Sequence, residues 1–561
     1  MMANPFELDK LTKVSNTNIV YSEVVFKDLA LLPKKGQSQF NDFWEERLTK
    51  GKTPIDAVIK KNNLCLPGKF EDQQKENEKK LNYSPALLTK LRSALHYRRE
   101  LTAQLFETEL FGVAQCLAET SSKLYHGTKS EIMKKFSALS CELNFDNSSA
   151  LVAELSPMVR SHNTSNCHTF RDIAFTLHSR ISKLASGFKR IDIVADRYFE
   201  NSLKENMRES RGSGSLFIFS DDTKIPTNFQ DDFLKNSANE SELYQYLARK
   251  FVELHSSEDQ VLVATYRSSI LTTVTNIETD GIMHCTSGEA DQRVVRHVLN
   301  LAKFGNFRDI LVTTSDTDVF LLLIAYFPLV KEIGEPHIYC KYGVGENAKY
   351  YSINTIAENL GFGVCEALPF FHAFSGCDTV SSFFKHSKSV MWNCWMEYPK
   401  HKDLTRIFKQ LSKQPQEVLP LHVDAIEAFT KYVYYSKMEA DAINMKRMKH
   451  FEYLAESNLR LLPPSRNGLT EHIKRAVLQG GWLWQEAVHN VEYQNPEDWG
   501  WLLKEEKFVP KWQSIEEPID IMLVCQVCTC KKAICKKCKC TKKGQDCLPF
   551  CGCRQECVKS S

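Results

Sequence analysis

The chain has 561 residues, a formal net charge of +3 and 43% hydrophobic residues. This length allows several domains with a sizeable core, and the near-neutral charge excludes a basic nucleic-acid coat, so any basic surface must be local. The amino terminus lacks a secretory signal pattern, and the longest apolar run, 319–327, is too short to span a bilayer. These features predict a cytosolic or nuclear location.

The first 139 residues divide into two regions. Residues 1–80 have weak periodicity and end in a charge-rich stretch, which is typical of a solvated helix or a linker. From Ser84 and Pro85, an N-cap followed by proline in the first turn, leucines recur at helical spacing. We therefore expect a poorly defined region over 1–80 and a helical region over 81–139.

Between residues 140 and 384, short β-type runs alternate with amphipathic segments, which indicates a mainly parallel sheet covered by helices. The clearest strands are 309–314 (DILVTT), 190–195 (RIDIVA) and 260–265 (QVLVAT). Ligands of such sheets bind at the carboxyl ends of the strands. The predicted fold class is therefore α/β, with the functional site at that edge of the sheet.

Acidic residues recur where these strands end or where helices begin. Asp196 follows one strand, and Asp316 and Asp318 follow another. The other members of the series are Glu289 and Asp291 before a helix expected near Val294, Asp378 in a Ser-Gly-Cys-Asp string, and Asp146 before a turn expected to enter a helix over 148–152. Alone, an aspartate at such a junction is most often a helix cap. The series is typical of a site for Mg²⁺ or Mn²⁺, which prefer oxygen ligands.

The order of these acids resembles the PIN-like fold of the flap-endonuclease and XPG-type nucleases, over about residues 146 to 385. The residues that match that family's pattern are, in order, Asp146 and Asp196 after the first two strands, Glu289 and Asp291 opening a helix, Asp316 and Asp318 as a D-x-D pair, and Asp378. The resemblance implies phosphodiester hydrolysis by two cations about 4 Å apart. Its implied ligands are Glu289, Asp291, Asp316 and Asp318, with Asp196 and Asp378 completing the shell.

Basic residues and histidines accompany the acids. Lys204, Arg208 and Arg211 share one helical face after Asp196. Their spacing alone favours a solvated face interleaved with glutamates, whereas the family resemblance implies that they hold phosphates. Three histidines stand near the acids, namely His284, His297 and His372. A lone histidine of this kind is more often packed and hydrogen-bonded than catalytic, so we expect structural roles for them.

Residues 385–520 return to helical patterning rich in tryptophan, which predicts a separate helical module. Strings such as FHAFSGCDTVSSF and LPPSRNGLTEHIKRAVLQGGWLWQ also resemble a narrower group of uncharacterised animal proteins, some of them transposon-associated, that join a PIN-like core to a helical segment and a cysteine-rich tail. Two departures are visible. Gly288 stands where that group carries an acid, and the segment after Asp378 lacks the glycines with which flap endonucleases grip duplex DNA.

Ten of the 19 cysteines fall in the tail, which spans 521–561. They are Cys525, Cys528, Cys530, Cys535, Cys538, Cys540, Cys547, Cys551, Cys553 and Cys557. Cysteines at this spacing can share a tetrahedral Zn²⁺, and so short a segment has little apolar material with which to fold without metal. Two mononuclear sites or a cluster with bridging thiolates are both compatible. Lysines between the cysteines predict phosphate contact.

The tail resembles half of a tesmin-type CXC domain, a zinc-binding and DNA-binding module. Taken together, these features predict a nuclear or nucleocytoplasmic, Mg²⁺- or Mn²⁺-dependent nuclease that acts on DNA, with a zinc-binding tail that contacts nucleic acid. The alternative is a catalytically inactive, transposon-derived DNA-binding or chromatin protein. Convergence of the carboxylates in one metal-sized pocket would favour the enzyme, and their capture by lysine or arginine would favour the alternative.

Overall fold

The computed structural model describes most of the chain from residue 85 to residue 553. The gaps are 141–142, 197–202, 204–214, 268, 276, 280, 283–289, 437–440, 455–457, 505–506, 516–518 and 532–537. Earlier in the chain it describes 12–13, 16–20, 37, 40–41 and 43–50.

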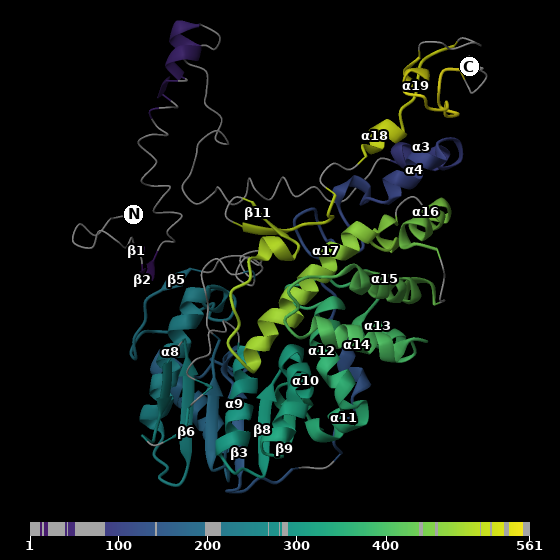
Figure 1. Ribbon diagram of the computed structural model, residues 1–561. Coiled ribbons are helices and arrows are strands. Elements are labelled where there is room, and N and C mark those ends of the chain that lie inside the picture. Colours follow the sequence, from purple (N-terminus) through teal and green to yellow (C-terminus); the bar gives the residue numbers. More distant parts are fainter. Residues whose placement is uncertain are drawn as a thin grey trace.

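A seven-stranded sheet with strand order β10-β9-β8-β3-β4-β6-β7 lies in the lower part of the view in Figure 1. Its strands are β3 (Ser149–Glu154), β4 (Arg190–Val194), β6 (Val261–Tyr266), β7 (Ser269–Thr272), β8 (Asp309–Thr314), β9 (His337–Tyr342) and β10 (Lys349–Ser352). The five inner strands pair in parallel, and β7 and β10 are antiparallel edges. The predicted α/β class with a mainly parallel sheet is confirmed.

Two details of the sheet differ from the sequence prediction. The segment after Asp146 does not turn into a helix, because 149–154 forms the fully buried central strand β3. Its small and β-branched side chains suit a strand that is covered on both faces. The helix expected near Val294 begins at Ala290, since the Asp196 carboxylate accepts a hydrogen bond from the Ala290 amide (2.9 Å) and caps it.

Helices cover both faces of the sheet. On one face α5 (Leu155–Arg160), α6 (Phe170–Leu184) and α8 (Ser237–Leu254) bury the side chains of β3, β4 and β6. On the other face lie α9 (Ala290–Phe304) and α10 (Thr317–Ile333). Hydrophobic burial on two faces explains why the inner strands read as continuous apolar runs.

Further helices extend the second layer. They are α11 (Ile353–Leu360), α12 (Phe362–Phe374), α13 (Lys388–Met396), α14 (His401–Leu411), α15 (Pro420–Tyr435), α16 (Ile443–Tyr453) and α17 (Arg466–Val477). One hydrophobic cluster runs from β8 and α10 through α12 into α14, α15 and α17. The predicted boundaries at 139, 384 and 520 stay predictions, and this cluster continues across the second of them.

The region predicted as helical before the sheet is helical only in its first part. It contains α3 (Pro85–Tyr97) and α4 (Arg99–Phe106). After α4 ends at Phe106, Phe111 and Gly112 both have positive φ, which a continuing helix does not allow. From there to residue 136 the chain forms loops and short 3-10 turns, including one over Lys129–Lys135, and it adds Leu117 and Ile132 to the core.

The tail lies against the first helices of the described chain, at the upper right of Figure 1. Its short helices α18 (Ile521–Val524) and α19 (Lys539–Lys542) follow a hairpin of β11 (Trp501–Lys504) and β12 (Lys507–Pro510). A third sheet joins β1 (Thr12–Lys13), β2 (Asn16–Val20) and β5 (Leu216–Phe217). Among the described residues, no helix combines the length and the apolar character that crossing a membrane requires.

Candidate functional site

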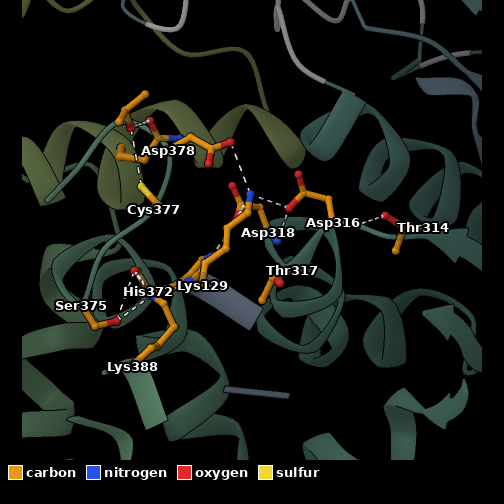
Figure 2. A network of polar contacts seen from close by, with 12 residues as sticks. Lys129, Thr314, Asp316, Thr317, Asp318, His372, Ser375, Cys377, Asp378 and Lys388 are labelled. Carbon is orange, nitrogen blue, oxygen red and sulfur yellow. Dashed lines mark hydrogen bonds and ion pairs between the residues drawn. The ribbon is translucent and has the colours of Figure 1, made fainter. Parts of the chain in front are cut away.

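Three of the predicted acids converge at the carboxyl edge of the sheet. Asp316 and Asp318 lie at the junction of β8 and α10, and Asp378 lies in the loop after α12 (Figure 2). One carboxylate oxygen from each lies within 4.8 Å of the others. Oxygen atoms in this arrangement fit a hard divalent cation such as Mg²⁺ or Mn²⁺.

Asp316 and Asp318 are held by the start of α10. Asp316 is the N-cap residue, and its Oδ1 accepts a hydrogen bond from the Asp318 amide (2.8 Å). The Asp316 amide in turn donates to Thr314 Oγ1 at the end of β8 (2.9 Å). Asp318 is buried in the first turn. The capping role and the ligand role are therefore compatible, because capping engages only one oxygen of Asp316.

Asp378 is positioned by a tight turn. Gly376 has φ +110°, and a Cβ at this position would clash with Ser382. The Cys377 amide donates to the Val380 carbonyl (3.0 Å), which closes the turn around Asp378. Only glycine suits this backbone conformation and spacing, so the Ser-Gly-Cys-Asp string has a structural reason.

Lys129 places its ammonium group inside the acidic cluster, as Figure 2 shows. Its Nζ lies 2.8 Å from Asp316 Oδ1, 3.1 Å from Asp318 Oδ1 and 3.3 Å from Asp378 Oδ2. Burial lowers the pKa of Lys129, but Asp318, Asp316, Asp378 and Asp291 outweigh it and hold that pKa well above its ordinary value. A metal ion bound by all three carboxylates would have to displace this ammonium. The sequence prediction did not include Lys129, which is 187 residues from Asp316.

His372 and Lys388 support Asp318 from inside the protein. His372 Nε2 donates to Asp318 Oδ1 (2.9 Å), and Lys388 Nζ lies 2.8 Å from His372 Nδ1. Lys388 also donates to the His372 carbonyl (2.6 Å) and to Ser375 Oγ (2.7 Å). Burial, followed by the charge of Lys388, lowers the pKa of His372 to about 4, so the imidazole is neutral at pH 7. His372 is thus the packed, hydrogen-bonded residue that the sequence predicts, although its partner is a candidate ligand.

Asp291 and Asp196 lie beside the cluster without joining it. Asp291 is buried in the first turn of α9, and its charge reaches Lys129. Asp196 follows β4 and caps α9 through Ala290. Among the described residues, the oxygens that converge within 4.8 Å come from Asp316, Asp318 and Asp378. Asp291 thus adds negative charge near Lys129, and Asp196 fixes the start of α9.

Among the described acids of the predicted series, Asp146 lies at the far edge of the sheet from the cluster. It precedes β3, whereas Asp316 follows the parallel strand β8, so the two lie at opposite ends of the sheet. Asp146 accepts from the Ser148 amide (2.9 Å) and pairs with Arg308 (3.3 Å). The sequence prediction for Asp146 is wrong because the first strand of this core, β3, follows Asp146 instead of preceding it.

Glu154 stands at the end of the first strand of the core, the position that the sequence prediction gives to Asp146. It ends β3, is buried, and its Oε2 accepts a hydrogen bond from Thr314 Oγ1 (2.5 Å). Thr314 therefore links Glu154 to the amide of Asp316. A signal was present in the sequence, since the apolar run at 150–153 ends in this acid.

His297 has the structural role expected of it. It is fully buried, and its Nδ1 lies 2.6 Å from Asp192 Oδ2. Arg190 donates to the same carboxylate. Burial lowers the pKa of His297 below its ordinary value. Glu289, Lys204, Arg208, Arg211 and His284 lie outside the described residues.

Four tail cysteines form a second group that could hold a metal ion. The sulfur atoms of Cys528, Cys540, Cys547 and Cys551 lie within 4.8 Å of one another. Four thiolates suit a tetrahedral structural zinc. The other described cysteines of the predicted set, Cys525, Cys530, Cys538 and Cys553, are not part of this group, and Cys535 and Cys557 lie outside the described residues.

Arg98 ties the cysteine group to the helices α3 and α4. This buried arginine donates to the carbonyls of Val524 (2.6 Å), Asp546 (2.8 Å) and Gln526 (2.9 Å). Its Nη2 also lies 3.4 Å from Cys540 Sγ. The described tail is therefore packed against the N-terminal helices and shares a hydrophobic cluster with them.

No family model and no curated protein matches this chain. Among solved structures, the chain is similar to one described as the catalytic core of Rad2 in complex with DNA substrate. The sequence identity is 15%, the TM-score is 0.26, and the match covers 60% of this chain and 98% of that chain. At this TM-score the likeness carries no functional argument.

Proposed function

We propose that the protein is a Mg²⁺- or Mn²⁺-dependent nuclease that hydrolyses phosphodiester bonds in DNA. The observation that supports this function best is the convergence of carboxylate oxygens from Asp316, Asp318 and Asp378 at the carboxyl edge of a parallel sheet. A bound divalent cation would supply an activated water and neutralise charge on the phosphate.

The surrounding residues have definite tasks in this proposal. Asp316, Asp318 and Asp378 hold the cation, and His372 fixes the orientation of Asp318 through its Nε2–H. Lys129 compensates the three carboxylates in the metal-free protein. When a metal ion neutralises the three carboxylates instead, the ammonium of Lys129 becomes available to the phosphate of the substrate. The side chain of Lys129 is 24% exposed, which leaves it a path to solvent.

The tail belongs to the same proposal. Its four converging cysteines would bind Zn²⁺. Its described lysines at 531, 539, 542 and 543 are exposed around the cysteines and would contact DNA phosphates. A nuclear or nucleocytoplasmic location fits this substrate and completes the proposal.

A second candidate function is supported by Lys129 itself. If the ammonium occupies the acidic cluster permanently, the core is an inactive nucleic-acid-binding domain, as the transposon-derived alternative would have it. The short distances from Lys129 Nζ to all three carboxylates favour this candidate.

A cleavage assay with purified full-length protein tests the proposed function. With Mn²⁺, the wild type should cut at least one of a panel of flap, bubble and single-stranded DNA substrates. The variant D316N/D318N should lose nearly all of this activity, because two of the three converging oxygen ligands are weakened. The matched control D222N/D403N changes two exposed aspartates and should cut like the wild type. Failure of the wild type to cut any substrate, or undiminished cutting by D316N/D318N, would refute the nuclease.

A further inference from the structure

A cavity of about 280 Å³ lies at the same edge of the sheet as the acidic cluster, on the side that α5 and α6 cover. We call it the β8–β9 pocket. It is lined by the ends of β8 and β9, by Met158 of α5, by Arg180 and Leu184 of α6, and by the loop around Val344. Crevices outside the carboxyl ends of parallel strands are where open α/β sheets bind ligands.

Two cations line this pocket without a carboxylate partner in the described part of the chain. Arg180 Nη1 donates only to neutral oxygens, Ser161 Oγ at 3.2 Å and the Met158 carbonyl at 3.4 Å. Lys341 Nζ lies 5.5 Å from the centroid of the Tyr350 ring, and no described carboxylate pairs with it. These three contacts position both cations and leave their charge available to an anion.

The single carboxylate of the pocket is already engaged. Glu154 lines the pocket, and its Oε2 accepts the hydrogen bond from Thr314 Oγ1. Two cations against one carboxylate leave a net positive charge in the pocket. The remaining walls include apolar side chains, Met158, Leu184 and Val344, which suit the flat face of a base or a sugar.

The pocket and the acidic cluster are adjacent through Thr314. This residue lines the pocket and accepts the hydrogen bond from the Asp316 amide. Its carbonyl also accepts from the amide of Gly343, another residue of the pocket wall (2.9 Å). Since phosphates recur every few ångströms along a nucleic-acid strand, a strand cut at the cluster can place a neighbouring phosphate here.

We propose that the β8–β9 pocket binds one unpaired nucleotide of the substrate strand, with its phosphate on Arg180 and Lys341 and its base or sugar against the apolar wall. This inference deepens the proposed function and depends on it for the identity of the strand. The volume is at the lower end for a small-molecule site and suits a single nucleotide.

Calorimetric titration of the full-length protein with deoxyadenosine 5′-monophosphate tests the pocket. Divalent cations are omitted so that the nucleotide phosphate cannot bind to a metal ion in the acidic cluster. We expect saturable binding to the wild type, weakened by about tenfold or more in R180A/K341A, because two charge-assisted contacts are lost. K402A/R406A removes the same two residue types from the exposed face of α14 and should bind like the wild type. Deoxyadenosine, which lacks the phosphate, should bind as weakly to the wild type as the nucleotide binds to R180A/K341A.

The proposal is overturned if the wild type does not bind the nucleotide at millimolar concentration, or if R180A/K341A binds it unchanged. An equal loss in K402A/R406A would also overturn it, because the effect would then be general electrostatic attraction. Thermal unfolding of each variant checks that the pocket substitutions leave the fold intact.

A competition experiment identifies the source of the nucleotide. A short single-stranded oligonucleotide should displace the mononucleotide from the wild type. If it does not, the pocket takes free mononucleotides and the assignment to a substrate strand is wrong. This binding does not require cleavage, so inactivity in the nuclease assay and failure of the pocket are separate outcomes.

Discussion

Lys129 determines how the acidic cluster behaves in the absence of metal. Its ammonium contacts Asp316, Asp318 and Asp378, and its side chain is about three-quarters shielded from solvent. Removing it would leave three carboxylates repelling one another at short range. The same removal would also take away the competitor of a divalent cation.

The variant K129M should therefore bind Mn²⁺ more tightly than the wild type, by about tenfold or more, and should be less stable without metal by about 2 kcal/mol. If Lys129 contacts the phosphate during cleavage, K129M should also cut DNA more slowly despite its tighter metal binding. Mn²⁺ titration by calorimetry and urea unfolding measure the first two effects.

Lys134 provides the control, because it lies in the same 3-10 turn but is exposed and pairs with Glu131 on the surface. K134M should leave Mn²⁺ affinity and stability unchanged. Equal Mn²⁺ affinity in K129M and the wild type would show that the ammonium does not compete for the site.

Gly376 is the residue on which the position of Asp378 depends. The variant G376A should destabilise the protein by about 3 kcal/mol and weaken Mn²⁺ binding, because its positive φ and the contact with Ser382 both exclude a Cβ. G363A is the matched control, since that position in α12 has open space for a Cβ and should be neutral or slightly stabilising. Equal stability of G376A and G363A in urea unfolding would contradict this account of the loop.

Among the elements, the contact of the tail with α3 and α4 is the least expected from the sequence. Arg98 lies between these helices and donates to three tail carbonyls. A buried arginine with so many acceptors joins two segments more than 400 residues apart. We therefore expect docking of α3 and α4 to be coupled to folding of the tail and to the binding of the Zn²⁺ proposed for its cysteines.

The variant R98A should raise the amide hydrogen exchange of 85–106 and 520–531 together, and removal of zinc by a chelator should produce the same pattern. R98A removes the donor of the tail carbonyls, and removal of zinc unfolds the tail that carries these carbonyls. In both cases α3, α4 and the tail lose their shared contact. R99A, which changes the exposed neighbour, should leave the exchange rates unchanged. Faster exchange confined to the tail would show that the two parts are not coupled.

At the scale of the whole molecule, the hydrophobic cluster that joins the sheet to the later helices predicts that they unfold together. His472 of α17 lies inside this cluster and donates through Nε2 to the Phe374 carbonyl of α12 (2.9 Å). Its Nδ1 is buried without a hydrogen-bond partner in the described structure. Burial, with the charge of Arg475, lowers the pKa of His472 to about 3.

This lowered pKa makes the whole molecule sensitive to acid. The unfolded state takes up a proton on His472 below the ordinary pKa of 6.5, whereas the folded state does so only near 3. Stability contributed by the neutral imidazole is therefore lost as the pH falls from 6.5 towards 3, by about 1.4 kcal/mol per pH unit. Between pH 7.5 and pH 5 the wild type should lose about 2 kcal/mol more than H472Q in urea unfolding.

The exposed residue His168 supplies the control, and H168Q should follow the wild type at both pH values. An identical pH dependence in H472Q and the wild type would place the acid sensitivity elsewhere in the molecule.

The sequence by itself determined the parallel sheet and most of the acids at its edge. Local rules are sufficient for these features, because buried parallel strands read as apolar runs and strand-helix junctions carry capping acids. The apolar run at Asp309–Thr314 predicts a strand with the observed bounds, and the series of acids includes Asp316, Asp318 and Asp378, which converge in the structure. The wrong position predicted for Asp146 has a local cause too, since the short apolar run that ends in Glu154 also fits a helix but forms β3.

Only the tertiary structure decided which groups meet. Lys129 reaches Asp316 across 187 residues, and Arg98 reaches the tail carbonyls across more than 400. No spacing rule encodes such contacts, because they arise when separate elements pack on one core. The tertiary structure also selected Cys528, Cys540, Cys547 and Cys551 from a longer cysteine series, since the folded chain brings only certain sulfur atoms to one point. Composition and pattern thus determined which acidic and cysteine side chains the chain offers, and packing decided which other groups each of them contacts.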